Sequence, residues 1–483
     1  METATQTLHR LTSYTTWEPG NGWEAPVIDP LVLVDLKVND MSRFPWFFKR
    51  YRQELPRIPL PRNLPPSRVP AVAVLAGTAD VVATGLGVLQ LSRLLHLSAG
   101  VVRTSKRPRG LHLYRAAGSA GARFPLELYV AVPEGERLPA GVHWYHPRAH
   151  ALVQVGPPPR DGVPALVVTG VPWRTGWRYR ERGYRHIYWD TGTLMAHVFA
   201  AADSGGFPAR LHTRFPDEAV AALVGADRVH EFPVAVVALG AGEAALTATG
   251  PAAVGATDAA PLEFPLVTAA QRAGELDTLG PPWDRGGPAG VPLTQSAPVE
   301  AVVLSRGSQR RMDSSRGLPA SLLRTCLPTA LRGITLPHRL VVNDVSELAP
   351  GVYRYPGLSA PSRPGVLRGE LFDVCLNQAL PRDAAFVVVA GTDVTALGDR
   401  EYREVNLTAG LAEGRLNLLA YALGAGASGM TFIDAKVPAL LGEPLDALLF
   451  TCVGVPAYRS ARGGMPGAPV MVRSVAPLHG DRA

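Results

Sequence analysis

Cysteine is scarce in this 483-residue chain. Its three cysteines, Cys326, Cys375 and Cys452, lie far apart and form no CxxC pair. A secreted disulfide framework would leave one of them unpaired, so we expect reduced thiols. The N-terminal segment METATQTLHR also lacks a basic stretch followed by an apolar run, which argues against a secretory signal.

Long apolar runs are absent as well. Even the most apolar region, from Val69 to Leu95, is interrupted by Asp80 and Arg93 and is rich in glycine and alanine. Such a composition fits buried helices and strands better than a bilayer crossing. Together with the cysteine usage, it predicts a soluble, cytoplasmic protein without a membrane partner.

The chain has a moderate excess of positive charge, with 48 basic and 41 acidic residues and a net charge of +7. Nearly all the basic residues are arginine, and they are spread along the chain. Neither the aromatic spacing of an RNA-binding sheet nor a continuous basic helix is present. We therefore expect no nucleic-acid partner, and phosphate-bearing cofactors or an acidic peptide are better candidates.

The length suffices for two or three domains, each with its own core. The proline-rich segment Pro56 to Pro66 predicts an extended connector on a surface. Between Gly240 and Ala297 the sequence is dominated by Ala, Gly, Pro and Thr and loses its apolar periodicity, which indicates an interdomain segment. The predicted divisions are an N-terminal extension and connector (1–66), a first half (67–240), a linker (241–297) and a second half (298–483).

The same order of features occurs on both sides of this linker. LPAGVHWYHP in the first half matches LAPGVYRYPG in the second, and Asp217 and Gly225 match Asp434 and Gly442 at a constant offset of 217. We interpret both aspartates as helix N-caps because each precedes a short apolar helix. The repeat predicts a pseudo-dimer within one chain, although a duplicated structural domain without chemistry is the alternative.

The strongest chemical motif is VVLSRGSQRRMD at the start of the second half. Arg306, Ser308 and Arg310 alternate there, and alternation in an extended segment places them on one face. Guanidinium groups and a hydroxyl on one face can bind a phosphate, whereas a solvated basic turn is the simpler alternative. Arg103 in RTSKR has the same spacing, but it follows a helix instead of preceding one, so we do not assign it.

These features resemble the nitroreductase family, whose members bind FMN between two subunits: R-x-S-x-R opening a domain, a glycine-rich break after a long helix, and a terminal VGVP. In more detail the chain is similar to the SagB-like azoline dehydrogenases of thiazole and oxazole peptide biosynthesis. The matching segments are LHRLTSY at Leu8, RAAGSAGARFPLELY from Arg115 to Tyr129, and AGVHWYHP from Ala140. The resemblance implies an α+β fold of two three-layer halves, each with a mainly antiparallel sheet, packed as an intramolecular dimer.

In that family each FMN site takes arginines from one subunit and a Ser/Gly loop from the other. Here the first half reads VLAGTADVVATGLG where arginines should stand, and the second reads CLPTALRGITLPHRL where the loop should lie. The resemblance therefore implies one intact composite site and one degenerate site. The FMN-binding residues it implies are Arg306, Ser308, Arg310, Ser119, Ala120, Gly121, Ser428, Gly429, Met430, Arg459 and Arg462, with Arg123 nearby.

Two other patterns near this site are not assigned to cofactors. GAGASGMTF spells G-x-G-x-x-G, but a dinucleotide fingerprint requires a preceding strand, and here a helix comes first. His143, His146 and His150 have no acidic or cysteine partner nearby, so no metal is expected. For Arg459 and Arg462, the alternative to FMN binding is a solvated basic tail.

Oxidising an azoline removes a proton from one ring carbon and a hydride from its neighbour. The family places a Lys-Tyr pair before the central helix of its first half, where this chain has Arg178 and Tyr179. Arginine cannot act as a base. Tyr179 could, if Arg178 and Arg182 lower its pKa, but both residues could instead cap and solvate the start of the helix.

The sequence thus predicts an FMN-dependent dehydrogenase that converts thiazolines or oxazolines to azoles in a ribosomal precursor peptide. Oxygen or another acceptor would reoxidise the flavin, and a cyclodehydratase complex is the implied partner. Association of two chains as a homodimer is left open. The alternatives are an NAD(P)H-dependent reductase of nitro or quinone compounds and a flavin-free scaffold subunit.

Overall fold

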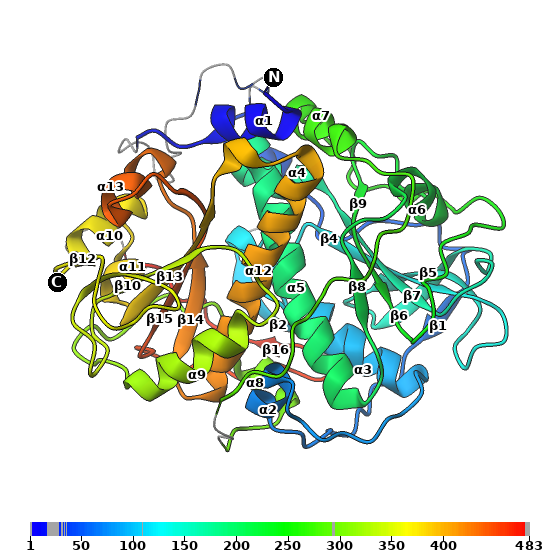
Figure 1. Cartoon of the computed structure of the whole chain (residues 1–483). Coiled ribbons are helices and arrows are strands. Elements are labelled where there is room, and N and C mark those ends of the chain that lie inside the picture. The colour runs from blue at the N-terminus through cyan, green and yellow to red at the C-terminus, as the bar shows by residue number, and fades with distance from the viewer. Residues whose placement is uncertain are drawn as a thin grey trace.

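Two long helices stand at the centre of the molecule, between the two main sheets (Figure 1). These are α5 (Gly183–Gly205) and α12 (Asp399–Ala422). The computed structural model describes residues 2–16, 29, 32, 34, 36–108, 110–291 and 295–478. Parts of the predicted extension (17–28) and linker (292–294) therefore lie outside the described residues.

The two central helices cross in close contact because glycine occupies the crossing point on both. A Cβ atom on Gly192 would lie 1.9 Å from the Leu407 carbonyl oxygen, and one on Gly410 would lie 2.1 Å from the Trp189 carbonyl oxygen. Gly192 and Gly410 stand 218 positions apart. The crossing is therefore the centre of the pseudo-twofold arrangement that the repeat predicts.

The first half is built on a seven-stranded sheet in the order β1-β6-β5-β4-β7-β9-β8, and all its pairings are antiparallel. Its strands are β1 (Arg57–Pro59), β4 (Leu126–Val132), β5 (Gly141–His146), β6 (Ala151–Gly156), β7 (Ala165–Gly170), β8 (Arg210–His212) and β9 (Phe232–Ala238). The predicted proline-rich connector thus contributes β1 at the sheet edge, where a missing amide donor is tolerated.

The second half is built on a six-stranded antiparallel sheet in the order β12-β11-β10-β13-β15-β14. Its strands are β10 (His338–Val342), β11 (Gly351–Arg354), β12 (Arg363–Pro364), β13 (Phe386–Thr392), β14 (Gly426–Met430) and β15 (Asp446–Gly454). A small third sheet, β16-β2-β3, joins the halves, since β16 (Val470–Met471) pairs with β2 (Val101–Arg107), beside β3 (Gly110–Arg115).

Each main sheet is buried on both faces, which makes each half three-layered. In β13, Phe386 and Val388 pack into the core shared with the central helices, whereas Val387 and Val389 pack into the core under the outer helices. This alternation follows from the two-residue period of a strand. The other α-helices are α1 (Ala4–Thr12), α2 (Ala71–Ala76), α3 (Val88–Ala99), α4 (Pro172–Tyr179), α6 (Asp217–Val224), α7 (Pro265–Ala273), α8 (Val299–Ser305), α9 (Ala320–Ala330), α10 (Arg368–Val374), α11 (Ala379–Asp383) and α13 (Val437–Leu441).

The pseudo-symmetry extends to α1 and α7, which lie side by side at one end of the central helices (Figure 1). His9 on α1 hydrogen-bonds to the hydroxyl of Tyr402, and Gln271 on α7 accepts a hydrogen bond from the hydroxyl of Tyr184, 218 positions earlier. The predicted extension and linker each carry one of these equivalent helices. The positions of the domain boundaries remain a prediction.

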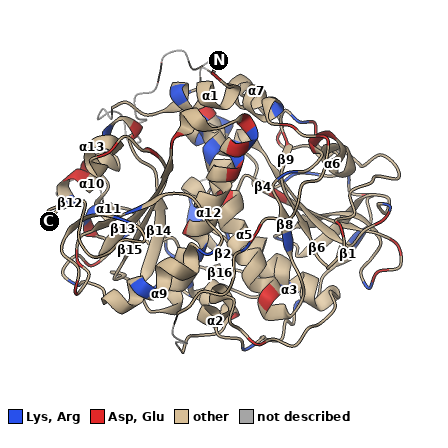
Figure 2. Cartoon of the chain, in the orientation of Figure 1, with Lys and Arg blue, Asp and Glu red and all other residues tan. Residues whose placement is uncertain are grey.

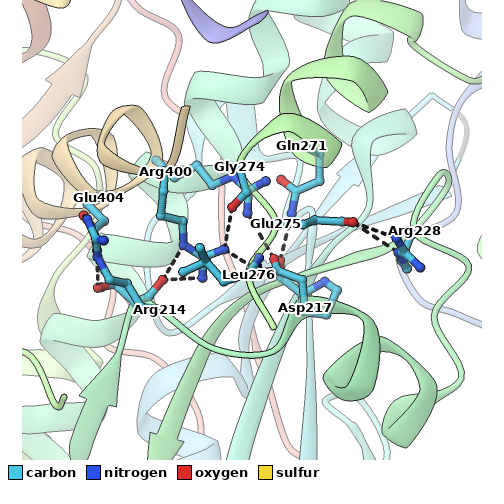
Figure 3. A network of polar contacts seen from close by, with 12 residues as sticks. Arg214, Asp217, Arg228, Gln271, Gly274, Glu275, Leu276, Arg400 and Glu404 are labelled. Atoms are coloured by element: carbon cyan, nitrogen blue, oxygen red, sulfur yellow. Dashed lines mark hydrogen bonds and ion pairs between the residues drawn. The ribbon is translucent and has the colours of Figure 1, made fainter. Parts of the chain in front are cut away.

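The interpretation of Asp217 and Asp434 as helix N-caps is wrong. The cap positions are Pro216 and Ile433, and neither helix has a side-chain cap bond. Asp217, which is 1% exposed, instead binds Arg400 and Arg403 of the opposite half at 2.7 and 3.0 Å (Figure 3). A pattern of residue types cannot distinguish a capping aspartate from one that is paired across an interface.

Asp434 makes the equivalent contacts with the first half. Arg182 and Arg185 bind its two carboxylate oxygens at 2.6 and 2.8 Å, and these guanidinium groups hold the pKa of Asp434 well below its usual range against the effect of burial. Acidic and basic segments consequently meet along the ends of the central helices beneath α1 (Figure 2). The two aspartates are thus matching anchors between the halves.

Cys326, Cys375 and Cys452 are free and buried, as predicted. Within the described part of the chain, no helix has the length and apolarity that crossing a bilayer would require.

Candidate functional site

A cavity of about 2370 Å³ lies where the two halves meet. Its wall combines the Ser/Gly loop of the first half with the R-x-S-x-R segment and β14 of the second. The predicted site residues that line it are Ser119, Ala120, Gly121, Arg123, Arg178, Tyr179, Arg306, Ser308, Arg310, Ser428, Gly429, Met430 and Arg459. Arg462 is exposed and does not line the cavity.

The loop and the arginine segment meet directly at Gly118. A Cβ atom on this glycine would lie 3.2 Å from Arg306 Nη1 and 3.6 Å from Ser308 Oγ. Residues almost 190 positions apart in sequence thus face each other across the cavity wall. The structure therefore brings together the two motifs that the resemblance assigns to opposite sides of one site.

Arg306 is buried at this junction, directly after helix α8, and its Nε atom has no hydrogen-bond partner. Burial lowers its pKa, an effect that the nearby Glu413 of α12 opposes. Glu413 itself is buried, which raises its pKa and weakens it as a counter-charge. A buried guanidinium with an unsatisfied donor and a weak counter-charge is suited to an anionic ligand.

Arg310 and Arg103 occupy different positions around Arg306. The Arg310 amide donates a hydrogen bond to Tyr458 Oη at 3.1 Å, while its side chain lines the cavity. Arg103 also lines the cavity, but it donates to the carbonyl oxygens of Leu304 and Ala461 at 2.5 and 2.6 Å. Arg103 therefore anchors the arginine segment to β2, in keeping with its exclusion from the predicted phosphate site.

The Ser/Gly loop is held by Asp190 on α5, a residue that the sequence did not single out. Asp190 accepts a hydrogen bond from the Ala120 amide at 2.9 Å and another from the Ser119 hydroxyl. Ser119 Oγ in turn accepts the Phe124 amide at 2.8 Å. These bonds fix the loop on the central helix and face it toward the second half.

We expect the contribution of Asp190 to stability to depend on pH. Burial raises its pKa to about 7 from a model-peptide value of 3.8. A raised pKa means that the stabilising contribution is present below about pH 4 and is lost as pH rises through about 7. Asp190→Asn should remove this dependence, so that the Tm of the variant exceeds that of the wild type by a few °C more at pH 8 than at pH 5. A Tm difference that does not change with pH would contradict the assignment.

Tyr179 and Arg178 lie against the same loop. A Cβ atom on Gly121, whose φ is +56°, would lie 2.7 Å from Tyr179 Oη and 2.8 Å from the Arg178 side chain. Tyr179 stacks on His186 with ring centroids 4.0 Å apart. Arg182, predicted to act on this phenol, binds the Asp434 carboxylate and the Thr12 carbonyl instead.

The outer wall contains an aromatic clamp that the sequence did not reveal. The Arg123 guanidinium lies 4.8 Å from the ring of Phe44 and 4.9 Å from that of Trp177. Burial and the neighbouring Arg178 lower the pKa of Arg123 to about 9. Phe44 comes from the N-terminal extension, so this segment forms part of the site.

The pseudo-symmetric counterpart of the cavity is filled by the chain's own linker. The Trp283 amide donates to the Leu211 carbonyl of β8 at 2.6 Å, and its ring stacks on Phe199 of α5. Arg285 binds both carboxylate oxygens of Asp203. Elements β8 and α5 correspond to β14 and α12 in the open cavity, so the linker occupies the space that would form the second site.

In the described parts of the chain, no group of three or more His, Cys, Asp and Glu side chains is placed to hold an ion. The side chain of His143 bonds to the Pro139 carbonyl, and His150 bonds to Tyr145 and Ser92. These two histidine side chains are therefore bonded to groups of the protein itself.

No protein-family model matches this sequence. Among solved structures, a protein of Anabaena variabilis described as a "putative nitroreductase" is similar over 94% of this chain and 100% of its own, with 23% identity and a TM-score of 0.70. A "putative nitroreductase" of Methanocaldococcus jannaschii is 25% identical over 166 residues, which cover 31% of this chain and 79% of that protein. The E. coli microcin synthetase complex also matches, over 45% of this chain and 77% of its own at 20% identity, but its TM-score of 0.27 is too low to carry an argument.

The likeness to the Anabaena structure spans almost the whole of both chains. The predicted fold is therefore confirmed: this chain has a nitroreductase-like α+β fold in two tandem halves. At 23% identity the likeness establishes the fold and not the activity.

Proposed function

We propose that this protein is an FMN-dependent oxidoreductase with one flavin site per chain. The observation that carries the proposal is the meeting of Arg306 and Ser308 with the Ser/Gly loop at Gly118, inside a cavity large enough for a flavin. Arg306, Ser308 and Arg310 would hold the phosphate. Residues 119–121 and 428–430 would contact the ring system through backbone groups, with Arg459 near the phosphate.

The residues fit the cofactor in charge as well as in position. Arg306 offers a buried donor without a partner, and Gly118 and Gly429 add no side chains of their own to the wall. The arginine segment, the loop and β14 are all held by contacts of their own, so the site is formed before any ligand enters. Arg462 has no part in this site.

For the reaction, we propose oxidation of azoline rings in a ribosomal peptide, as the sequence resemblance implies. FMN would accept the hydride from one ring carbon. Tyr179 is the residue placed to take the proton, because its oxygen lies against the loop that would carry the flavin ring; it would act as the phenolate and become the phenol. Arg178 would position the substrate or the phenol, since a guanidinium cannot take a proton.

Tyr179→Phe should lower kcat about 100-fold while leaving the FMN content unchanged, because it removes one hydroxyl and little volume. The measurement is azole formation from a thiazoline peptide, which mass spectrometry detects as the loss of two hydrogen atoms. Tyr458→Phe is a matched control, since Tyr458 also lines the cavity but accepts the Arg310 amide. Equal loss of activity in both variants would contradict a specific role for Tyr179.

The second candidate is an NAD(P)H-dependent flavin reductase, favoured by the cationic wall of the cavity, which suits a dinucleotide's phosphates. Anaerobic mixing distinguishes the two. Bleaching of the flavin by a thiazoline peptide and not by NADPH supports dehydrogenation, and the reverse result supports the reductase. A colourless protein that takes up no added FMN would support a scaffold subunit.

A further inference from the structure

Strand β3 runs along the cavity as an unpaired edge. It is the outer strand of the order β16-β2-β3, and within the described residues no strand pairs with its other side. All six of its residues, Gly110 to Arg115, line the cavity. An exposed strand edge presents free backbone donors and acceptors, which an extended peptide can satisfy.

The direction of β3 leads to the proposed flavin site. Two residues beyond Arg115 the chain enters the Ser/Gly loop, where Gly118 faces Arg306. The other end of β3, at Gly110 and Leu111, is exposed, and Leu111 is 45% exposed. A peptide that pairs with β3 would thus run from the surface to the reacting centre.

The charge of the cavity wall specifies what kind of peptide fits. Thirteen of the described lining residues are arginine or lysine, and two, Asp190 and Glu413, are acidic. Asp190 accepts a hydrogen bond from the Ser/Gly loop, and Glu413 accepts one from the Thr193 hydroxyl. Lys49 is buried and paired with Glu231 behind the wall, and the two negative charges of a flavin phosphate would still leave the wall with an excess of positive charge.

Several of these cations lie beside β3. Arg107, at the end of β2, donates to the Ser474 hydroxyl at 2.6 Å, and Arg473 lines the same wall. Arg123 is fixed between Phe44 and Trp177 next to the loop. Guanidinium groups placed along an extended ligand favour carboxylate side chains.

We infer that β3 is a docking strand for an acidic, extended peptide substrate, which adds to the sheet edge and is thereby led to the flavin. The inference rests on the proposed function, because it names the substrate class of that site. The proposed ligand is a peptide because the row of free backbone donors and acceptors on β3 can pair with a polypeptide and not with a nucleotide.

The test uses the FMN-loaded protein and a fluorescein-labelled peptide of about ten residues that alternates glutamate with valine. Binding is followed by anisotropy, and backbone protection by hydrogen exchange. We expect protection of 110–115, and a Kd about tenfold higher when alternate peptide amides are N-methylated, since several hydrogen bonds are then lost. A lysine-valine peptide should not bind.

Arg107→Gln should raise the Kd of the glutamate peptide several-fold, whereas Arg324→Gln, a matched change at an exposed position outside the cavity, should not. Equal binding of the N-methylated peptide, or no protection of 110–115, would overturn the inference. So would protection of these residues by NADPH in place of the peptide. If the protein takes up no FMN but the peptide still protects β3, the flavin chemistry is refuted and the docking strand is supported.

Discussion

Replacing Arg306 with alanine is expected to raise the dissociation constant for FMN by about three orders of magnitude. The guanidinium is buried, its Nε atom has no partner, and it lies at the contact between the two halves. Losing a buried, charge-assisted pair costs roughly 4 kcal/mol, which corresponds to about a thousandfold change in affinity. Quenching of FMN fluorescence on titration with FMN-free protein measures the change.

Arg311→Ala is the matched control for this experiment. Arg311 is also part of the arginine segment, but its Nε atom donates to the Ala476 carbonyl and it does not line the cavity. The control should bind FMN like the wild type. Arg103 is a poorer control, because its bonds to the Leu304 and Ala461 carbonyls hold the segment in place. Equal loss of FMN in the Arg306 and Arg311 variants would contradict the specific role of Arg306.

Asp217→Asn is expected to lower the free energy of unfolding by about 4 kcal/mol. The change leaves Arg400 and Arg403 buried without their shared carboxylate, and uncompensated buried charges of this kind are strongly destabilising. The Leu276 amide also donates to Asp217 at 3.0 Å, so the substitution would also weaken the bond that holds the segment after α7. Urea unfolding followed by tryptophan fluorescence measures the effect.

Glu218→Gln provides the comparison on the neighbouring residue. The Glu218 side chain is 82% exposed and pairs with Arg228 at the surface, so its loss should cost less than about 1 kcal/mol. If both variants unfold at the same urea concentration, the aspartate is not an anchor between the halves. In Figure 3, Asp217 lies inside the network, whereas Arg228, the partner of Glu218, lies at its margin.

Much of the site was predictable because its motifs are local. Arg306, Ser308 and Arg310 stand within five positions, so residue types and spacing pointed to them, whereas the Ser/Gly loop, a single short segment, was identified through the family resemblance. The repeat was also visible, because both halves keep the same order of strand, helix and glycine. Both signals depend on neighbours in sequence.

The features that sequence could not supply depend on contacts across the fold. Asp190 lies on a buried helix and acts on a loop 70 positions away, and no local pattern marks that pairing. The clamp of Phe44 and Trp177 around Arg123 joins three separate segments. Likewise, nothing in the composition of the linker shows that Trp283 fills the second pseudo-symmetric space.

We propose that one composite cavity holds one FMN, while its pseudo-symmetric counterpart is filled by the linker. Titration of the FMN-free protein with FMN, followed by flavin fluorescence and absorbance, tests it most directly. We expect saturation at one FMN per chain. Saturation at two equivalents, or no binding at all, would contradict it.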